Sequence, residues 1–82
     1  MPKYFFKLID QGEVFHDSEG QMLEDDEVAR HEAGIALSEI AREVLAVDGL
    51  AHEFEIVVSN EKGEVVWTTK LDFEAVAGSA HQ

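Results

Sequence analysis

Residues 26–47 read DEVARHEAGIALSEIAREVLAV, and this stretch decides the fold. It is rich in Ala, Leu and Glu, which favour helices, and Asp25 or Asp26 can cap its start. Projected at ~100° per residue, one face collects small and apolar side chains: Ala29, Ala33, Ala36, Leu37, Ile40, Ala41, Val44 and Val47. Because half of these are alanine, we expect the helix to lie close against a sheet.

Alternating apolar segments flank this helix on both sides, as strands do when one face is buried. They cover residues 3–10, 13–17, 53–59 and 64–73. The short links Gln11-Gly12 and Asn60-Glu61-Lys62-Gly63 favour hairpin turns. The sequence therefore predicts an α+β fold of the order ββαββ, in which two hairpins form a four-stranded, mainly antiparallel sheet with one helix packed on one face.

The expected domain covers residues 1–74, and residues 75–82 form a short polar tail that we expect to fray. Alternation places the predicted core on one face of the sheet, against the helix: Tyr4, Phe6, Leu8, Phe54, Ile56, Val58, Val65, Trp67 and Leu71. The pattern leaves the strand order beyond the two hairpins open.

A single helix covers only one face of such a sheet, and the opposite face is more apolar than contact with water requires. That face is predicted to carry Phe5, Lys7, Ile9, Val57 and Val66. Two apolar helix residues, Val28 and Ile35, also fall outside the core stripe. Together these residues are the candidate interaction surface, either for self-association or for an unidentified protein partner.

The charge excludes some partners and favours others. Six lysines and arginines against eighteen acids give a formal net charge of 6 − 18 = −12. Direct nucleic-acid binding and an anionic membrane surface are disfavoured, because both need a basic patch. A basic partner is favoured electrostatically. The alternative to an interaction module is therefore an acidic decoy that occupies the basic site of a nucleic-acid-binding protein, and the plainest interpretation is that the acids keep the protein soluble.

The residues with chemical potential do not form a recognised catalytic or metal motif. His16-Asp17 lies in a polar turn, and His31-Glu32 is followed by Ile35 where a zinc-protease motif needs a second histidine. The acidic run 24–27 lacks the spacing of a calcium loop and suits helix capping. No serine lies in a nucleophile elbow. We therefore expect no enzyme activity, no metal and no cofactor.

Compartment is predicted from what the chain lacks. It has no cysteine, which fits a reducing environment. The run Tyr4-Phe5-Phe6 is broken by Lys7, so neither a secretory signal nor a membrane span is predicted. The expected location is the cytoplasm.

Four segments in order resemble a family of short uncharacterised bacterial proteins, a domain of unknown function that opens Met-Pro-x-Tyr-Phe-Phe. They are Met1-Pro2-Lys3-Tyr4-Phe5-Phe6, Asp17-Ser18-Glu19-Gly20, Ala29-Arg30-His31-Glu32-Ala33 and Asn60-Glu61-Lys62-Gly63. In the family, Asp-Gly follows the first strand directly, whereas here Asp10-Gln11-Gly12 has one extra residue. The resemblance implies the domain limits and the order of elements, and it implies no activity.

Overall fold

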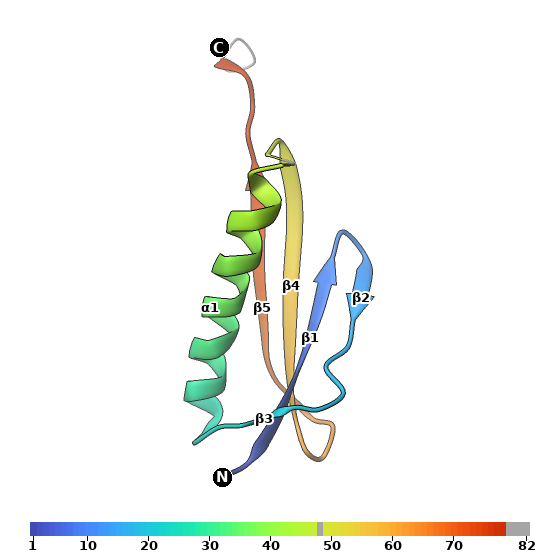
Figure 1. Ribbon diagram of the computed structural model, residues 1–82, viewed down its shortest axis with the longest axis vertical. Coiled ribbons are helices and arrows are strands. Elements are labelled where there is room, and N and C mark those ends of the chain that lie inside the picture. Colours follow the sequence, from blue (N-terminus) through green and yellow to red (C-terminus); the bar gives the residue numbers. More distant parts are fainter. Residues whose placement is uncertain (48, 79–82) are drawn as a thin grey trace.

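The computed structural model describes residues 1–47 and 49–78, and it is an α+β structure of one sheet and one helix (Figure 1). The elements in chain order are β1 (Lys3–Asp10), β2 (Glu13–Phe15), β3 (Gln21–Met22), α1 (Asp26–Leu45), β4 (Ala51–Asn60) and β5 (Val65–Glu74). One helix on an antiparallel sheet confirms the predicted class. The described part of the predicted tail is residues 75–78, and residues 79–82 lie outside the described residues.

The helix begins where its sequence predicts. Asp25 is the N-cap, and its Oδ1 accepts a hydrogen bond from the backbone N–H of Val28 at 2.9 Å. Asp26 and Glu27 lie in the first turn, where negative charge is favourable. The helix ends at Leu45, two residues before the predicted end. Its buried stripe is Ala29, Ala33, Leu37 and Ala41, so the small side chains face the sheet as expected.

The sheet has the strand order β2-β1-β4-β5, with every pairing antiparallel. The expected count of four strands needs one correction, because β3 is a fifth strand that pairs with β1. Leu8 of β1 pairs with Phe15 of β2, while Lys3 and Tyr4 pair with β3. β2 and β3 therefore lie along the same edge of β1 as one interrupted strand. The second strand is therefore shorter than the predicted 13–17 and ends at Phe15, before the turn that leads to β3.

A β-bulge between β4 and β5 corrects the predicted core. The register shifts at Val58 and Ser59, so that Val58 pairs with Trp67 and Ser59 pairs with Val65. Val65, which alternation placed in the core, is 59% exposed. Val66, which alternation placed on the opposite face, packs against the core cluster. The extra residue of a bulge breaks the two-residue period on one strand only.

The rest of the predicted core is present between α1 and the sheet. Tyr4, Phe54, Ile56 and Val58 are buried with the alanine stripe, and the partly buried Phe6, Leu8, Trp67 and Leu71 pack against them. Asp26 joins three elements at one end of this core. Its Oδ1 accepts a hydrogen bond from the Tyr4 hydroxyl at 2.6 Å, and its backbone carbonyl accepts one from Trp67 Nε1 at 2.7 Å. The start of α1 is thereby held to both β1 and β5.

Candidate interaction surface

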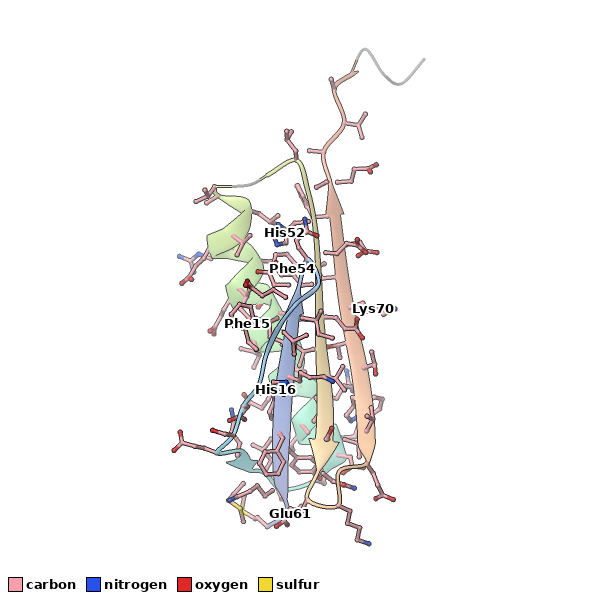
Figure 2. All side chains as sticks on the ribbon, turned by 90° about the vertical axis from the view of Figure 1, so that its right-hand side faces the viewer. Phe15, His16, His52, Phe54, Glu61 and Lys70 are labelled. Carbon is pink, nitrogen blue, oxygen red and sulfur yellow. The ribbon has the colours of Figure 1, made fainter. Side chains whose placement is uncertain are left out.

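The face of the sheet turned away from α1 is called the open face here. Directly paired residues on neighbouring strands point to the same side, which assigns the open face from the register: Lys3, Phe5, Lys7, Ile9, Val14, Met22, Ala51, Glu53, Glu55, Val57, Ser59, Val65, Thr68, Lys70, Asp72 and Glu74. Figure 2 shows Lys70 pointing away from α1, whereas His52 and Phe54 lie between the helix and β4. No described helix covers the open face.

Apolar side chains form the middle of the open face. Phe5, Ile9 and Val57 come from the adjacent strands β1 and β4 and are partly buried by their neighbours. Val14 on β2 is 45% exposed, and Val65 at the bulge extends the patch to β5. The patch therefore runs across the sheet from one edge to the other. Lys7 lies beside Val57, so this region contains four of the predicted surface positions: Phe5, Lys7, Ile9 and Val57.

The open face is nearly neutral although the protein is strongly acidic. It carries three lysines and four acids, Glu53, Glu55, Asp72 and Glu74, which gives 3 − 4 = −1 of the total charge of −12. Near its middle, Lys7, Glu55 and Lys70 form no ion pair among the residues that the structure describes. Charge of both signs is thus free to meet an opposing surface.

The loop between β2 and β3 presses on one side of the patch. Asp17 Oδ1 accepts hydrogen bonds from the backbone N–H groups of Glu19 and Gly20, at 3.2 and 3.0 Å. Gly20 has φ +76°, and a Cβ there would lie 2.9 Å from both Lys3 Cγ and Phe5 Cε1. Only glycine suits this position, because the backbone is left-handed and the Phe5 ring lies directly beneath it.

The structure does not bring all the predicted surface residues together. Val66 belongs with the core, as described above. Val28 and Ile35 lie on α1, on the other side of the sheet from Phe5 and Val57. Val28 is partly buried and Ile35 is 39% exposed. The candidate interaction surface is therefore two separate surfaces, one on the open face and one beside the helix.

Sequence reasoning missed a buried pair at the end of the core. His52 is 8% exposed, and its Nε2 is hydrogen-bonded to Asp10 Oδ1. The His52 ring also stacks on Phe54, with 4.4 Å between ring centroids. A signal was present, since extending the alternation of Phe54, Ile56 and Val58 back by two residues places His52 on the core face. Asp10 reaches it because β1 and β4 are paired there.

The surroundings of this pair do not suggest catalysis. The hollow beside His52 is about 340 Å³ and is lined by Gln11, Ala51, His52, Glu53, Asp72, Phe73 and Glu74. It contains no hydroxyl or thiol side chain that His52 would activate as a nucleophile. Within residues 1–47 and 49–78, no three His, Cys, Asp or Glu side chains are grouped to hold a metal ion. The hydrogen bond between Asp10 and His52 joins β1 to β4.

One comparison with known proteins places the chain in a family. Residues 3–72 match the model of the domain of unknown function DUF6894. The chain belongs to this family. The matched residues include every strand and the helix except the last two residues of β5, so the DUF6894 domain and the observed sheet coincide. The searches of curated proteins and of solved structures gave no match.

In the part of the DUF6894 chain that is described, no helix combines the length and the apolar character that crossing a bilayer requires.

Proposed function

We propose that this DUF6894 chain is a non-catalytic protein-interaction module and that its open face packs against a second copy of itself. The observation that carries the proposal is the contrast in charge, since the open face holds −1 of a total of −12. Two copies at −12 repel each other, so contact is least costly through the one face where acids and lysines balance.

The charges at the middle of the face also favour a second copy over an unrelated partner. Lys7, Glu55 and Lys70 have no ion-pair partners within the described chain. In a two-fold dimer the same patch meets itself, so a patch with both signs can pair a lysine of one copy with a glutamate of the other. An all-acidic or all-basic patch would repel its own copy.

The size of the face is sufficient for a weak but specific dimer. Three strands of eight to ten residues and the short β2 and β3, spaced ~4.8 Å apart at ~3.3 Å per residue, give roughly 500 Å² per copy. This is just below the standard size of about 600–1,000 Å² on each partner and is typical of weak complexes. The apolar patch around Phe5, Ile9 and Val57 supplies the central part of that area.

Sedimentation velocity over a concentration series tests the dimer. Val57→Glu introduces a charge at the centre of the open face and should shift the protein to monomer. Val47→Glu is the matched control, because Val47 is 91% exposed beyond the end of α1 and the same change there should leave the dimer intact. A wild-type protein that stays monomeric at the highest concentration, or equal effects of the two variants, would contradict the proposal.

Mixing two charge variants gives a sharper test of the two-fold contact. Glu55→Lys leaves only lysines at the middle of the open face, and Lys70→Glu leaves two acids and one lysine there, so each variant alone should associate weakly. Mixed together, they should form a heterodimer because the altered faces are complementary. If the mixture associates no better than the separate variants, Glu55 and Lys70 do not lie across an interface.

The acidic decoy stays a second candidate because of where the remaining charge lies. Residues 24–45 carry seven acids and two arginines, so this segment alone holds 2 − 7 = −5. All of those acids except Glu32 are exposed. A pull-down at low salt that recovers a nucleic-acid-binding protein, released by added DNA, would support the decoy, whereas recovery of no basic protein would count against it.

A further inference from the structure

The side of the sheet that carries α1 is only half covered. A helix is about 10 Å wide and strands are ~4.8 Å apart, so one helix covers about two strands. α1 packs over β4 and β5, and Figure 1 shows β1 and β2 on the far side of β4 from the helix. The strip above β1 and β2, beside α1, is where a second helix would lie in a fully covered sheet.

The floor of this strip is apolar. Phe15 pairs with Leu8, so both point to the side of α1, and Phe15 is 48% exposed. Figure 2 shows Phe15 on the helix side of β1. A hollow of about 270 Å³ lies between β1 and the helix, lined by Phe6, Gln21, Glu32, Ile35, Ala36 and Glu39. The strip and this hollow lie on the same side of the sheet beside α1, and together they are called the helix-side groove.

The wall of the helix-side groove is acidic. Glu32 and Glu39 both line the hollow from α1, seven residues and therefore about 10.5 Å apart along the helix axis. Neither forms an ion pair among the described residues. Ile35 lies between them in sequence and is 39% exposed. The groove thus offers an apolar floor and two free carboxylates spaced by two helical turns.

We propose that the helix-side groove binds a cationic amphipathic helix of another protein. Apolar side chains of that helix pack on Phe6, Phe15 and Ile35, and two lysines or arginines seven residues apart reach Glu32 and Glu39. The surface is separate from the open face, so the proposal goes beyond self-association and does not depend on it.

Charge decides the occupant. A second copy would offer α1 itself, but that helix carries five acids and two arginines, 2 − 5 = −3, and the groove wall repels it. The chain's own C-terminal residues 75–82 contain no lysine or arginine to meet Glu32 and Glu39. A cationic helix satisfies both the apolar floor and the acidic wall.

The test uses a panel of synthetic fluorescent helices of about 18 residues, roughly 27 Å long. Each has one apolar face flanked by lysines seven residues apart, and the panel varies the position of the apolar residues. Binding is followed by fluorescence anisotropy. A reference peptide with glutamates in place of the lysines should not bind.

Matched charge variants locate the site. Glu32→Lys together with Glu39→Lys should weaken binding at least ~10-fold, because two attractions become repulsions. Glu19→Lys together with Glu61→Lys makes the same change in net charge at two exposed loop positions outside both surfaces and should alter affinity less than ~3-fold. Ile35→Ser should weaken binding without any change in charge, and circular dichroism checks that every variant is folded.

Two results would overturn the proposal. If both double variants lose affinity equally, the peptides are attracted to the overall charge of −12 and not to the groove. If no peptide of the panel binds wild-type protein, the groove does not accept a cationic helix. Neither result bears on self-association, which sedimentation velocity measures in the absence of peptide. The dimer proposal is therefore judged separately.

Discussion

The contact between Gly20 and Phe5 makes a quantitative prediction, because a second glycine provides its control. Gly20 and Gly63 have nearly the same positive φ, +76° and +81°. They differ in their surroundings: a Cβ at Gly20 would lie 2.9 Å from Phe5 Cε1, whereas nothing lies within 4 Å of one at Gly63. The pair Gly20→Ala and Gly63→Ala therefore separates backbone strain from steric contact.

The expected magnitudes follow from those two terms. An alanine in the left-handed conformation destabilises the folded state by about 1–2 kcal/mol. The smaller conformational entropy of the unfolded alanine variant offsets part of this, so Gly63→Ala should lower the free energy of unfolding by about 1 kcal/mol. Gly20→Ala adds the cost of inserting a methyl group against packed side chains, about 1–3 kcal/mol. Lys3 moves cheaply, but the Phe5 ring is held on the sheet. We expect a total of about 2–3 kcal/mol.

Urea denaturation of both variants measures the difference. The free energy of unfolding should fall two to three times as much for Gly20→Ala as for Gly63→Ala, with unchanged m-values. Truncating the ring relieves the contact, so Gly20→Ala should cost less in a Phe5→Leu background than in the wild type. Equal losses for the two glycines would refute the inference that the loop before β3 presses on the open face.

Three further predictions use other parts of the molecule. The hydrogen bond to Asp26, then burial and the charges of Asp26 and Asp25, raise the pKa of Tyr4 from 10.0 to about 12; stability should therefore be complete below pH 10 and fall as the pH rises through 12, since the unfolded chain loses the proton first. Tyr4 is the single tyrosine, so phenolate absorbance follows it directly, and Tyr4→Phe should remove this part of the alkaline loss. Ala33→Leu should destabilise by about 1–3 kcal/mol because Ala33 is fully buried, whereas Gly34→Ala, exposed on the same helix, should stabilise by about 0.5–1 kcal/mol; thermal melts that fail to move in opposite directions would contradict the packing of α1. Added salt should strengthen the dimer by screening −12 against −12 and weaken peptide binding in the helix-side groove, so titrations at about 20 and 200 mM salt that change in the same direction would contradict one of the two interfaces.

Most of the fold could be predicted from the sequence because the helical and strand periodicities of its apolar residues are strong. The alanine stripe predicted which side of α1 is buried, and alternation predicted Tyr4, Phe54 and Ile56 in the core. The predicted sides of Val65 and Val66 were wrong because the bulge adds one residue to β5 and so shifts its alternation by one position at that point. The fifth strand, β3, was missed because two residues are too few to show a period.

The candidate surface was predictable only in part, for a related reason. Alternation places Phe5, Ile9 and Val57 on one face, but it does not say how many strands one helix covers. The helix-side groove depends on α1 lying over β4 and β5, which is a tertiary fact. The pairing of His52 with Asp10 depends on the register of β1 with β4, and that register joins residues 42 positions apart.

The interruption between β2 and β3 has a consequence for assembly through sheet edges. An edge strand exposes unpaired N–H and C=O groups to which another chain can add. β5 presents ten uninterrupted residues of this kind, whereas the opposite edge offers only three residues and then two, separated by the turn at residues 16–20. Two copies that joined through β5 would leave outside only their interrupted edges, and a third copy would find no continuous strand to extend. In such a pair, growth by strand addition would stop, because the short break in each outer edge leaves no continuous strand for a further copy.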